Sequence, residues 1–211
     1  MRRWFPPIAV LAAALVSAFA YGRLPDRVPT HWNMAGEPDA WGSRLVGVGI
    51  VPLIMLLIMA LVPVIPRLDP RRANYEKFWP TYLLVMNVTL AFMLGLHIVL
   101  ISAMLGSGVR IERLLRLGLG ALLVVLGNVL PRTRSNWLFG IRTPWTLSSD
   151  RVWERTHRVG GYLMLGAGLV AILAGLLVPD RAMFVMMGGI TVAALGSIVY
   201  SYAVWRKERE S

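Results

Sequence analysis

Six long apolar blocks separated by polar stretches set the pattern of this chain. The blocks cover residues 4–22, 45–66, 79–105, 114–130, 159–178 and 182–205. Each comes close to or exceeds the roughly 20 residues that an α-helix needs to cross a bilayer. Lipid offers no hydrogen bonds to the backbone, so a helix is the natural spanning element for such blocks. The pattern therefore predicts an all-α membrane protein with about six transmembrane helices.

Two of the blocks leave alternatives open. The first follows Arg2 and Arg3 and ends in the small residues around position 20, a pattern that also fits a secretory signal peptide. Cleavage there would leave five spans. The fourth block is the shortest and carries Arg116 near one end, a position that a long side chain tolerates by extending to the membrane surface.

Composition agrees with a membrane protein and excludes some chemistry. Hydrophobic residues make up 56% of the chain and charged residues 16%, and the mean hydropathy is +0.61, values unusual for a soluble domain. The chain has no cysteine, which rules out disulfides, thiolate nucleophiles and cysteine-based zinc sites. We expect no cofactor and no metal.

Membrane topology explains the net charge of +11 better than binding to nucleic acid does. With six spans, the side that holds both termini carries 15 of the 22 Lys and Arg residues and the other side carries 7. Basic residues near span ends favour the cytoplasm. We therefore predict cytoplasmic termini, a bacterial inner-membrane location and no direct contact with nucleic acid. The seven outer residues are Arg23, Arg27, Arg44, Arg110, Arg113, Arg116 and Arg181.

Three regions describe the expected organisation. Residues 1–66 form a two-helix unit with a structured extracytoplasmic loop at 23–44. Residues 67–113 supply a cytoplasmic loop, the third helix and a short outer loop. Residues 114–211 hold a cytoplasmic loop at 131–158 and the last three helices.

The outer loop is rich in turn formers, aromatic residues and polar groups. His31, Glu37 and Asp39 are possible metal ligands by residue type. Their spacing matches no strong metal motif, and we prefer a structured cap over the helix ends. The candidate recognition residues in this loop are His31, Trp32, Asn33, Gly36, Asp39 and Trp41.

The inner loop carries too many aromatic and arginine residues for a passive connector. Pro131 ends the fourth span, and Pro144 favours an extended Thr143. Ser148 or Ser149 then caps a new helix that runs into the fifth span. One face of this helix carries Trp153, Thr156, His157 and Gly160.

Two features of the inner loop admit a functional and an ordinary interpretation. Glu154 and His157 form a possible acid–base pair, whereas Glu154 and Arg158 have the spacing of an i, i+4 ion pair, which we prefer. Arg132, Arg134 and Arg142 suit either an anionic partner or lipid headgroups.

The same loop carries a family resemblance. The segments NVLP at 128–131, NWLFGIRTPWT at 136–146 and WERTHR at 153–158 closely resemble the signature of the SdpI family of membrane immunity proteins. The outer segments PTHWN at 29–33 and WGS at 41–43, with Gly36, look like a small domain of unknown function that often precedes this signature. Together the two resemblances cover most of the chain.

The resemblance implies toxin immunity and signal transduction without catalysis. The expected partners are membrane lipids, a secreted antimicrobial peptide toxin and a cytoplasmic transcriptional repressor. The family offers no catalytic residues, so the matching positions are a candidate cytoplasmic surface. They are Asn128, Pro131, Asn136, Gly140, Arg142, Thr143, Pro144, Trp145, Trp153, Glu154, Thr156 and His157.

Two other functional classes remain open. A transporter or channel would use polar groups inside the bilayer, of which Asn87, Thr89, His97 and Asn128 are candidates. A metal-dependent membrane enzyme would need convergent acid, base or metal ligands. The predicted topology separates His31, Glu37 and Asp39 from Glu154 and His157 by the membrane, which disfavours this class.

Overall fold

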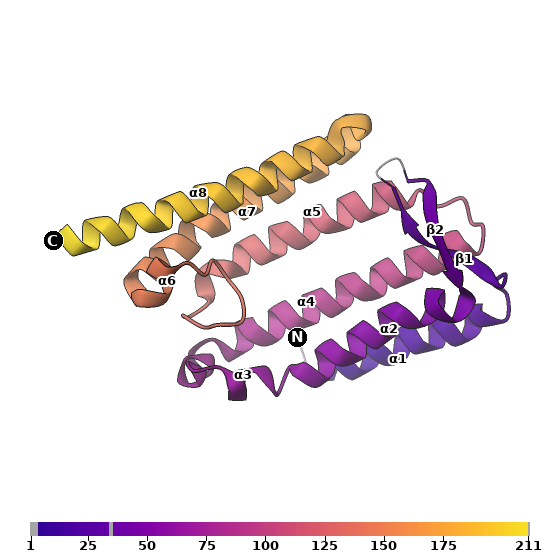
Figure 1. The fold of residues 1–211 in the computed structure, drawn as a ribbon, viewed down its shortest axis with the longest axis horizontal. Helices are drawn as coiled ribbons and strands as arrows, with labels where there is room; N and C mark the ends of the chain where they lie inside the picture. Colours follow the sequence, from indigo (N-terminus) through magenta and orange to yellow (C-terminus); the bar gives the residue numbers. More distant parts are fainter. Residues whose placement is uncertain (1–3, 34–35, 211) are drawn as a thin grey trace. The chain divides into compact units, whose positions relative to one another are not determined.

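The computed structural model describes residues 4–33 and 36–210, so Arg2 and Arg3 lie outside it. Within the described residues, five helices are long and apolar enough to cross a membrane (Figure 1). They are α2 (Arg44–Leu61), α4 (Arg72–Met104), α5 (Ile111–Val129), α7 (Asp150–Leu177) and α8 (Ala182–Glu210). The predicted all-α, multi-pass membrane architecture is confirmed.

A sixth apolar helix, α1 (Phe5–Tyr21), has 17 residues. This length is the lower limit of the approximately 17–25 residues of transmembrane helices. The cytoplasmic position of both termini stays a prediction.

The helices expose large apolar side chains, as expected where lipid is the solvent. Leu53 on α2 is 66% exposed, Leu173 on α7 is 54% exposed and Val199 on α8 is 67% exposed. A soluble helix directs such residues toward a core, and contiguous apolar surface on this scale is rare in water. The bilayer therefore replaces part of the protein core.

In the described part of the chain, four short helical segments lie between the long helices. They are α3 (Ile65–Leu68), the 3-10 turn η1 (Leu130–Arg132), α6 (Pro144–Ser148) and the 3-10 turn η2 (Pro179–Arg181). Each has proline in its first turn, where the missing N–H is not needed.

The loop between α1 and α2 contains a β-hairpin that the sequence pattern did not predict. Strands β1 (Arg27–Trp32) and β2 (Pro38–Ser43) pair antiparallel, with register shifts between Pro29 and Trp32. Gly36, at φ +84°, adopts the left-handed conformation, which glycine reaches without a steric penalty. The Asn33 side chain accepts a 3.0 Å hydrogen bond from the Glu37 N–H.

The chain forms two compact units. Unit 1 comprises Met1–Leu61 and Met86–Gly118, and unit 2 comprises Val62–Val85 and Leu119–Ser211. Helices α4 and α5 are each divided between the two units, with one part in unit 1 and the other part in unit 2.

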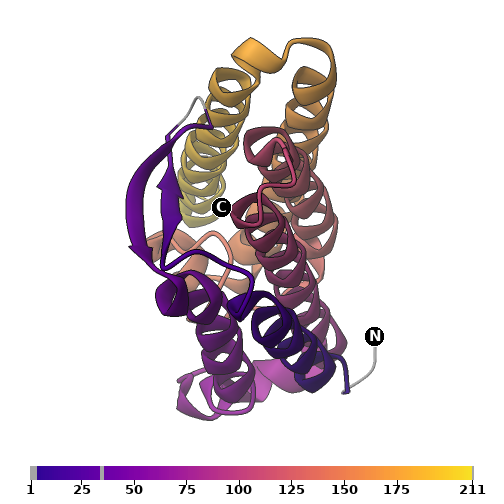
Figure 2. The same ribbon diagram turned by 90° about the vertical axis from the view of Figure 1, so that its right-hand side faces the viewer.

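Unit 1 is built on α1 and α2, which lie side by side in both views (Figures 1 and 2). Its first apolar cluster contains Ala9, Ala13, Val51, Met55 and Leu90. A second cluster includes the fully buried Val28 of β1, which fastens the hairpin to the helices. The Ser17 hydroxyl donates to the Val48 carbonyl at 2.7 Å and lies 2.9 Å from Nε2 of buried His97, so polar contacts also link α1, α2 and α4.

Unit 2 contains α7 and α8, which also lie side by side in both views. Helices α5 and α7 approach closely at two glycines. A Cβ on Gly127 would lie 2.7 Å from the Gly161 carbonyl oxygen. A Cβ on Gly161 would lie 2.7 Å from the Gly127 carbonyl oxygen. Small residues permit this backbone contact in membrane helices.

The start of α4 differs from the expected span at 79–105. The helix begins at Arg72, and Phe78 interrupts it with φ −137° and ψ 22°. Pro80, two residues later, has no N–H to donate to the preceding turn. The helical segment before this kink, residues 72–77, contains polar residues and belongs to unit 2.

Candidate functional site

The inner loop and the first turns of α7 fold into one compact region, which we call the loop block (residues 130–158). Ser149 caps α7 by accepting a 3.3 Å hydrogen bond from the Val152 N–H, and the helix continues unbroken to Leu177. The predicted helix start and its continuation into the fifth span are confirmed. The predicted face is also confirmed, since Trp153, Thr156, His157 and Gly160 are all buried.

His157 connects this face to the loop. Its Nε2 accepts a 3.0 Å hydrogen bond from the Ile141 N–H, so Nδ1 carries the proton and donates to the Trp153 carbonyl at 2.8 Å. The ring also stacks on Trp153, with centroids 3.8 Å apart. With both nitrogens engaged by the backbone, His157 is a structural imidazole rather than the base of a pair with Glu154.

The loop backbone is shaped by its own polar side chains. Buried Asn136 accepts hydrogen bonds from the N–H groups of Leu138 and Phe139 at 2.9 and 3.0 Å, and donates to the Arg134 carbonyl at 2.8 Å. This is the local turn chemistry that asparagine favours. Gly140 follows at φ +110°. Together they turn the chain toward His157.

A capping box starts α6. Thr143 is extended, as predicted, and its hydroxyl accepts from the Thr146 N–H while the Thr146 hydroxyl accepts from the Thr143 N–H. The Thr143 and Ser201 hydroxyls lie 3.2 Å apart, which links α6 to α8. Trp145 packs on Tyr202 at 5.1 Å between ring centroids.

A buried carboxylate outside the inner loop fastens the loop block to α4. Asp69 accepts hydrogen bonds from the Tyr75 hydroxyl at 2.8 Å, the Trp137 N–H at 2.8 Å and the Arg71 N–H at 2.7 Å. Asp69 was not among the residues predicted from the sequence. No local motif marks it, because one of its partners is 68 residues away.

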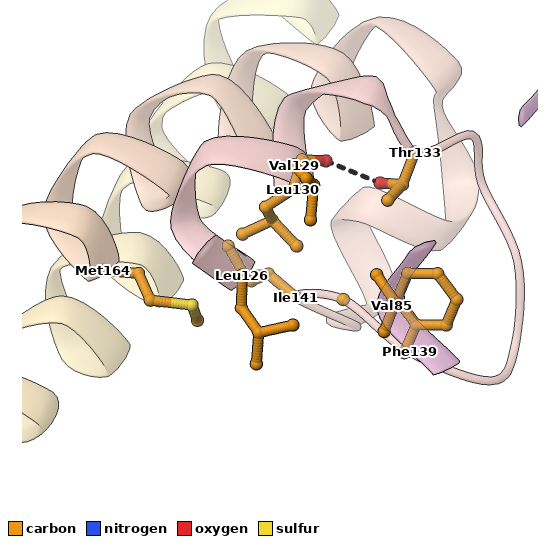
Figure 3. Close-up of a pocket in the computed structure, with 9 residues that line it drawn as sticks. Val85, Leu126, Val129, Leu130, Thr133, Phe139, Ile141 and Met164 are labelled. Carbon is orange, nitrogen blue, oxygen red and sulfur yellow. Dashed lines mark hydrogen bonds between the residues drawn. The ribbon is translucent and has the colours of Figure 1, made fainter. Parts of the chain in front are cut away.

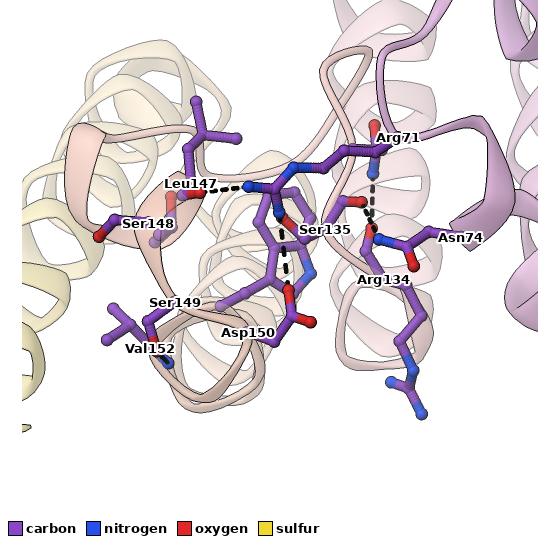
Figure 4. A network of polar contacts seen from close by, with 12 residues as sticks. Arg71, Asn74, Arg134, Ser135, Leu147, Ser148, Ser149, Asp150 and Val152 are labelled. Atoms are coloured by element: carbon purple, nitrogen blue, oxygen red, sulfur yellow. Dashed lines mark hydrogen bonds and ion pairs between the residues drawn. The ribbon is translucent and has the colours of Figure 1, made fainter.

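Arg71 extends this attachment (Figure 4). Its guanidinium donates to the Ser135 hydroxyl and the Leu147 carbonyl, and lies 3.6 Å from an Asp150 carboxylate oxygen. The Asn74 amide donates to the Ser135 carbonyl at 2.8 Å. Four contacts from Arg71, which precedes α4, and from Asn74 in its first turn therefore hold the inner loop near Ser135 and near Leu147 and Asp150.

The expected i, i+4 ion pair of Glu154 with Arg158 is wrong. The Glu154 carboxylate lies 3.7 Å from Nη1 of Arg134 instead. The folded loop brings Arg134 to the first turns of α7, and a tertiary partner replaces the local one.

Exposure divides the candidate cytoplasmic residues into two groups. Asn128, Gly140, Arg142, Pro144 and Glu154 are exposed, and Pro131 and Trp145 are partly buried. Asn136, Thr143, Trp153, Thr156 and His157 are buried and shape the loop block. Trp137, which we did not select, is 51% exposed. Its position in the NWLFGIR segment could have identified it as a candidate.

The β1–β2 hairpin brings His31 and Asp39 together. Nδ1 of His31 lies 2.5 Å from an Asp39 carboxylate oxygen, and both side chains are largely exposed. Glu37 contacts Asn33 instead. Within residues 4–33 and 36–210 no three His, Cys, Asp or Glu side chains are arranged to hold a metal ion. Trp41 is 53% exposed and Trp32 is half-buried.

An apolar pocket of about 210 Å³ lies beside the loop block (Figure 3). Its walls come from α4 (Val85), the end of α5 (Leu126), the loop (Phe139) and α7 (Met164). Thr133 adds a hydroxyl, which donates to the Leu130 carbonyl at 2.8 Å. The lining consequently presents apolar groups to the space.

Comparison with known proteins separates the same two parts of the chain. Residues 132–201 match the SdpI/YfhL protein family. This part of the chain is similar to the SdpI/YfhL family. Residues 8–56 match a domain of unknown function (DUF1648). The resemblance predicted from the sequence is thus confirmed, with the family region in unit 2 and the preceding domain in unit 1.

Three relatives extend the comparison. The "Immunity protein SdpI" of Bacillus subtilis is 26% identical over 200 residues, which cover 95% of this chain and 94% of the relative. An uncharacterized protein of Archaeoglobus fulgidus is 36% identical over 82 residues, covering 38% of this chain and 44% of the relative. The uncharacterized membrane protein YbgB of Bacillus subtilis is 27% identical over 78 residues, which cover 37% of this chain and 76% of the relative.

No solved structure matches the chain. The SdpI/YfhL region begins at η1 and ends in α8, so it contains most of the loop block together with α7. The buried contacts of His157 and Asn136 therefore lie within the segment that resembles this family.

Proposed function

We propose that the protein is an immunity protein of the bacterial inner membrane that protects its host from a secreted antimicrobial peptide. The similarity over 95% of the chain to a protein named for immunity carries this proposal. Because both chains align nearly from end to end, the likeness includes the outer hairpin as well as the SdpI/YfhL region.

The hairpin supports a recognition role on the outer face. Trp41 and His31 are exposed on a scaffold that Val28 fastens to the helices. Exposed aromatic side chains on a rigid element supply much of the binding energy at protein interfaces. An incoming peptide would meet this element first under the predicted topology.

The loop block supports a second surface, for a cytoplasmic transcriptional repressor. Arg142 and Trp137 are exposed, and the Arg142 guanidinium donates to the Trp137 carbonyl. Arginine and tryptophan are enriched among residues that dominate interfaces. Catalysis forms no part of the proposal, since His157 uses both nitrogens for backbone contacts.

Host survival tests the immunity proposal. Sensitive cells with and without the protein are exposed to a panel of secreted membrane-active peptides at matched membrane abundance. The wild type should protect against at least one peptide, and Trp41→Ala should lose that protection. Trp79→Ala is the control, because its exposed indole lies on α4 rather than on the hairpin.

The possible results separate the parts of the proposal. Failure of the wild type against every peptide contradicts immunity. Full protection by Trp41→Ala contradicts the role of the hairpin. For the inner surface, exposure to the protective peptide should change host transcription in wild-type cells and not in Trp137→Ala cells, and equal responses contradict repressor binding at this site.

A further inference from the structure

We propose that the apolar pocket beside the loop block binds one acyl chain of an anionic phospholipid, whose headgroup lies at Arg132 and Arg142. The pocket is distinct from the hairpin, and its headgroup end shares Arg142, whose guanidinium also donates to the Trp137 carbonyl, with the Trp137 surface. The proposal concerns a defined lipid site and does not depend on immunity.

The size and lining of the pocket suit a hydrocarbon chain. Its volume of about 210 Å³ lies below the about 300–1,000 Å³ of sites for whole drug-sized ligands. Leu126, Phe139 and Met164 contribute apolar walls, and the Thr133 hydroxyl is occupied by the Leu130 carbonyl. A polar soluble ligand would find few hydrogen-bond partners there.

Two arginines next in sequence to lining residues suit an anionic headgroup. Arg132 lies between the lining residues Leu130 and Thr133, and Arg142 directly follows the lining residue Ile141. Both arginines are exposed, and neither forms an ion pair with any described residue.

The acidic residues of the loop block are already paired. Asp150 lies by Arg71, and Glu154 lies by Arg134. Arg132 and Arg142 consequently keep their charge available for a phosphodiester, which arginine recognises through two parallel N–H donors.

Topology favours lipid over a secreted peptide as the occupant. The excess of basic residues predicts that the loop block faces the cytoplasm, where anionic lipids attract arginines next to membrane spans. A peptide arriving from outside would have to cross the bilayer first, whereas lipid is present at this depth.

Selectivity should come from the headgroup rather than from the chain. An acyl chain gains little by leaving other acyl chains for an apolar pocket, because lipid is already as apolar as leucine. Each arginine near an anionic headgroup strengthens binding about five-fold. Two arginines therefore predict a preference for anionic over zwitterionic lipid of about 30-fold.

Native mass spectrometry of the purified full-length protein in detergent tests the site. Dioleoylphosphatidylglycerol and dioleoylphosphatidylcholine are titrated separately, and glycerol phosphate serves as a headgroup without chains. We expect one tightly bound phosphatidylglycerol, with a Kd about 30-fold below that of phosphatidylcholine. Glycerol phosphate should not displace it.

Two sets of variants locate the lipid. Met164→Trp fills the pocket and should weaken phosphatidylglycerol binding at least about ten-fold, whereas Leu169→Trp, on an exposed position of the same helix, should not. The double variant Arg132→Gln/Arg142→Gln should reduce the preference to about two-fold. Its control, Arg155→Gln/Arg158→Gln, removes two exposed arginines of α7 that do not adjoin the pocket lining.

Several outcomes would overturn the proposal. Equal binding of the two lipids removes the role of charge, and displacement by glycerol phosphate assigns the arginines to free phosphate. Unchanged binding in a folded Met164→Trp protein places the lipid elsewhere. If Met164→Trp does not fold, the arginine variants, altered only at exposed positions, still decide the question.

Discussion

The backbone N–H of Ile141 donates a 3.0 Å hydrogen bond to Nε2 of His157, whose side chain has no exposed surface. This bond joins the chain before α6 to the buried face of α7. Because Nδ1 of the same ring donates to the Trp153 carbonyl, one side chain serves both helix and loop. The stability of the loop block should depend on it.

His157→Ala should lower the free energy of unfolding by about 2–4 kcal/mol, because it opens a cavity against Trp153 and leaves the Ile141 N–H without its acceptor. Arg158→Ala, its exposed neighbour, should change stability by less than about 0.5 kcal/mol. Thermal unfolding in detergent measures both. Equal midpoints for the two variants would contradict the structural role of His157.

Gly140→Ala should destabilise the protein by about 1–3 kcal/mol. A left-handed conformation at φ +110° is unfavourable for alanine, and the new Cβ would lie 2.4 Å from Nε2 of His157. The control is Gly166→Ala, where a Cβ in α7 meets nothing within 4 Å, and this change should be neutral or slightly stabilising. A Gly140→Ala protein that melts with the control would contradict the close contact.

Asp69→Ala should release the loop block from the start of α4. Three donors lose their acceptor, among them the Trp137 N–H, and buried donors without partners are costly. Limited trypsin digestion should then cut at Arg132 or Arg134 at least about ten times faster than in the wild type. Asp150→Ala is the control, because its carboxylate is 78% exposed and such surface pairs contribute little.

Single cysteines should reveal the topology without background, since the chain has none. A membrane-impermeant maleimide should label Ser107→Cys, in the connection between α4 and α5, in intact cells. Ser148→Cys at the end of α6 should be labelled only after permeabilisation. Both serines are exposed, so the reverse pattern would invert the orientation and place the termini outside.

The sequence by itself determined the features that depend on neighbouring residues. Apolar blocks longer than a bilayer predict helices, and these appear at nearly the expected positions. A serine cap at Ser148 or Ser149 also follows from local rules. So does the shared face of Trp153 and His157, because helical geometry fixes which positions three and four apart meet. The hairpin was not predicted, because its short polar strands lack a clear alternating pattern of apolar and polar residues.

Only the tertiary structure decided which distant groups meet. Asp69 reaches Trp137 across 68 positions of the chain, and Arg134 replaces the local Arg158 as the partner of Glu154. Neither choice is encoded in periodicity, because it depends on the loop folding back on α7 and α4. Local patterns fix where helices form, whereas burial and the need to satisfy every buried polar group fix how their connections pack.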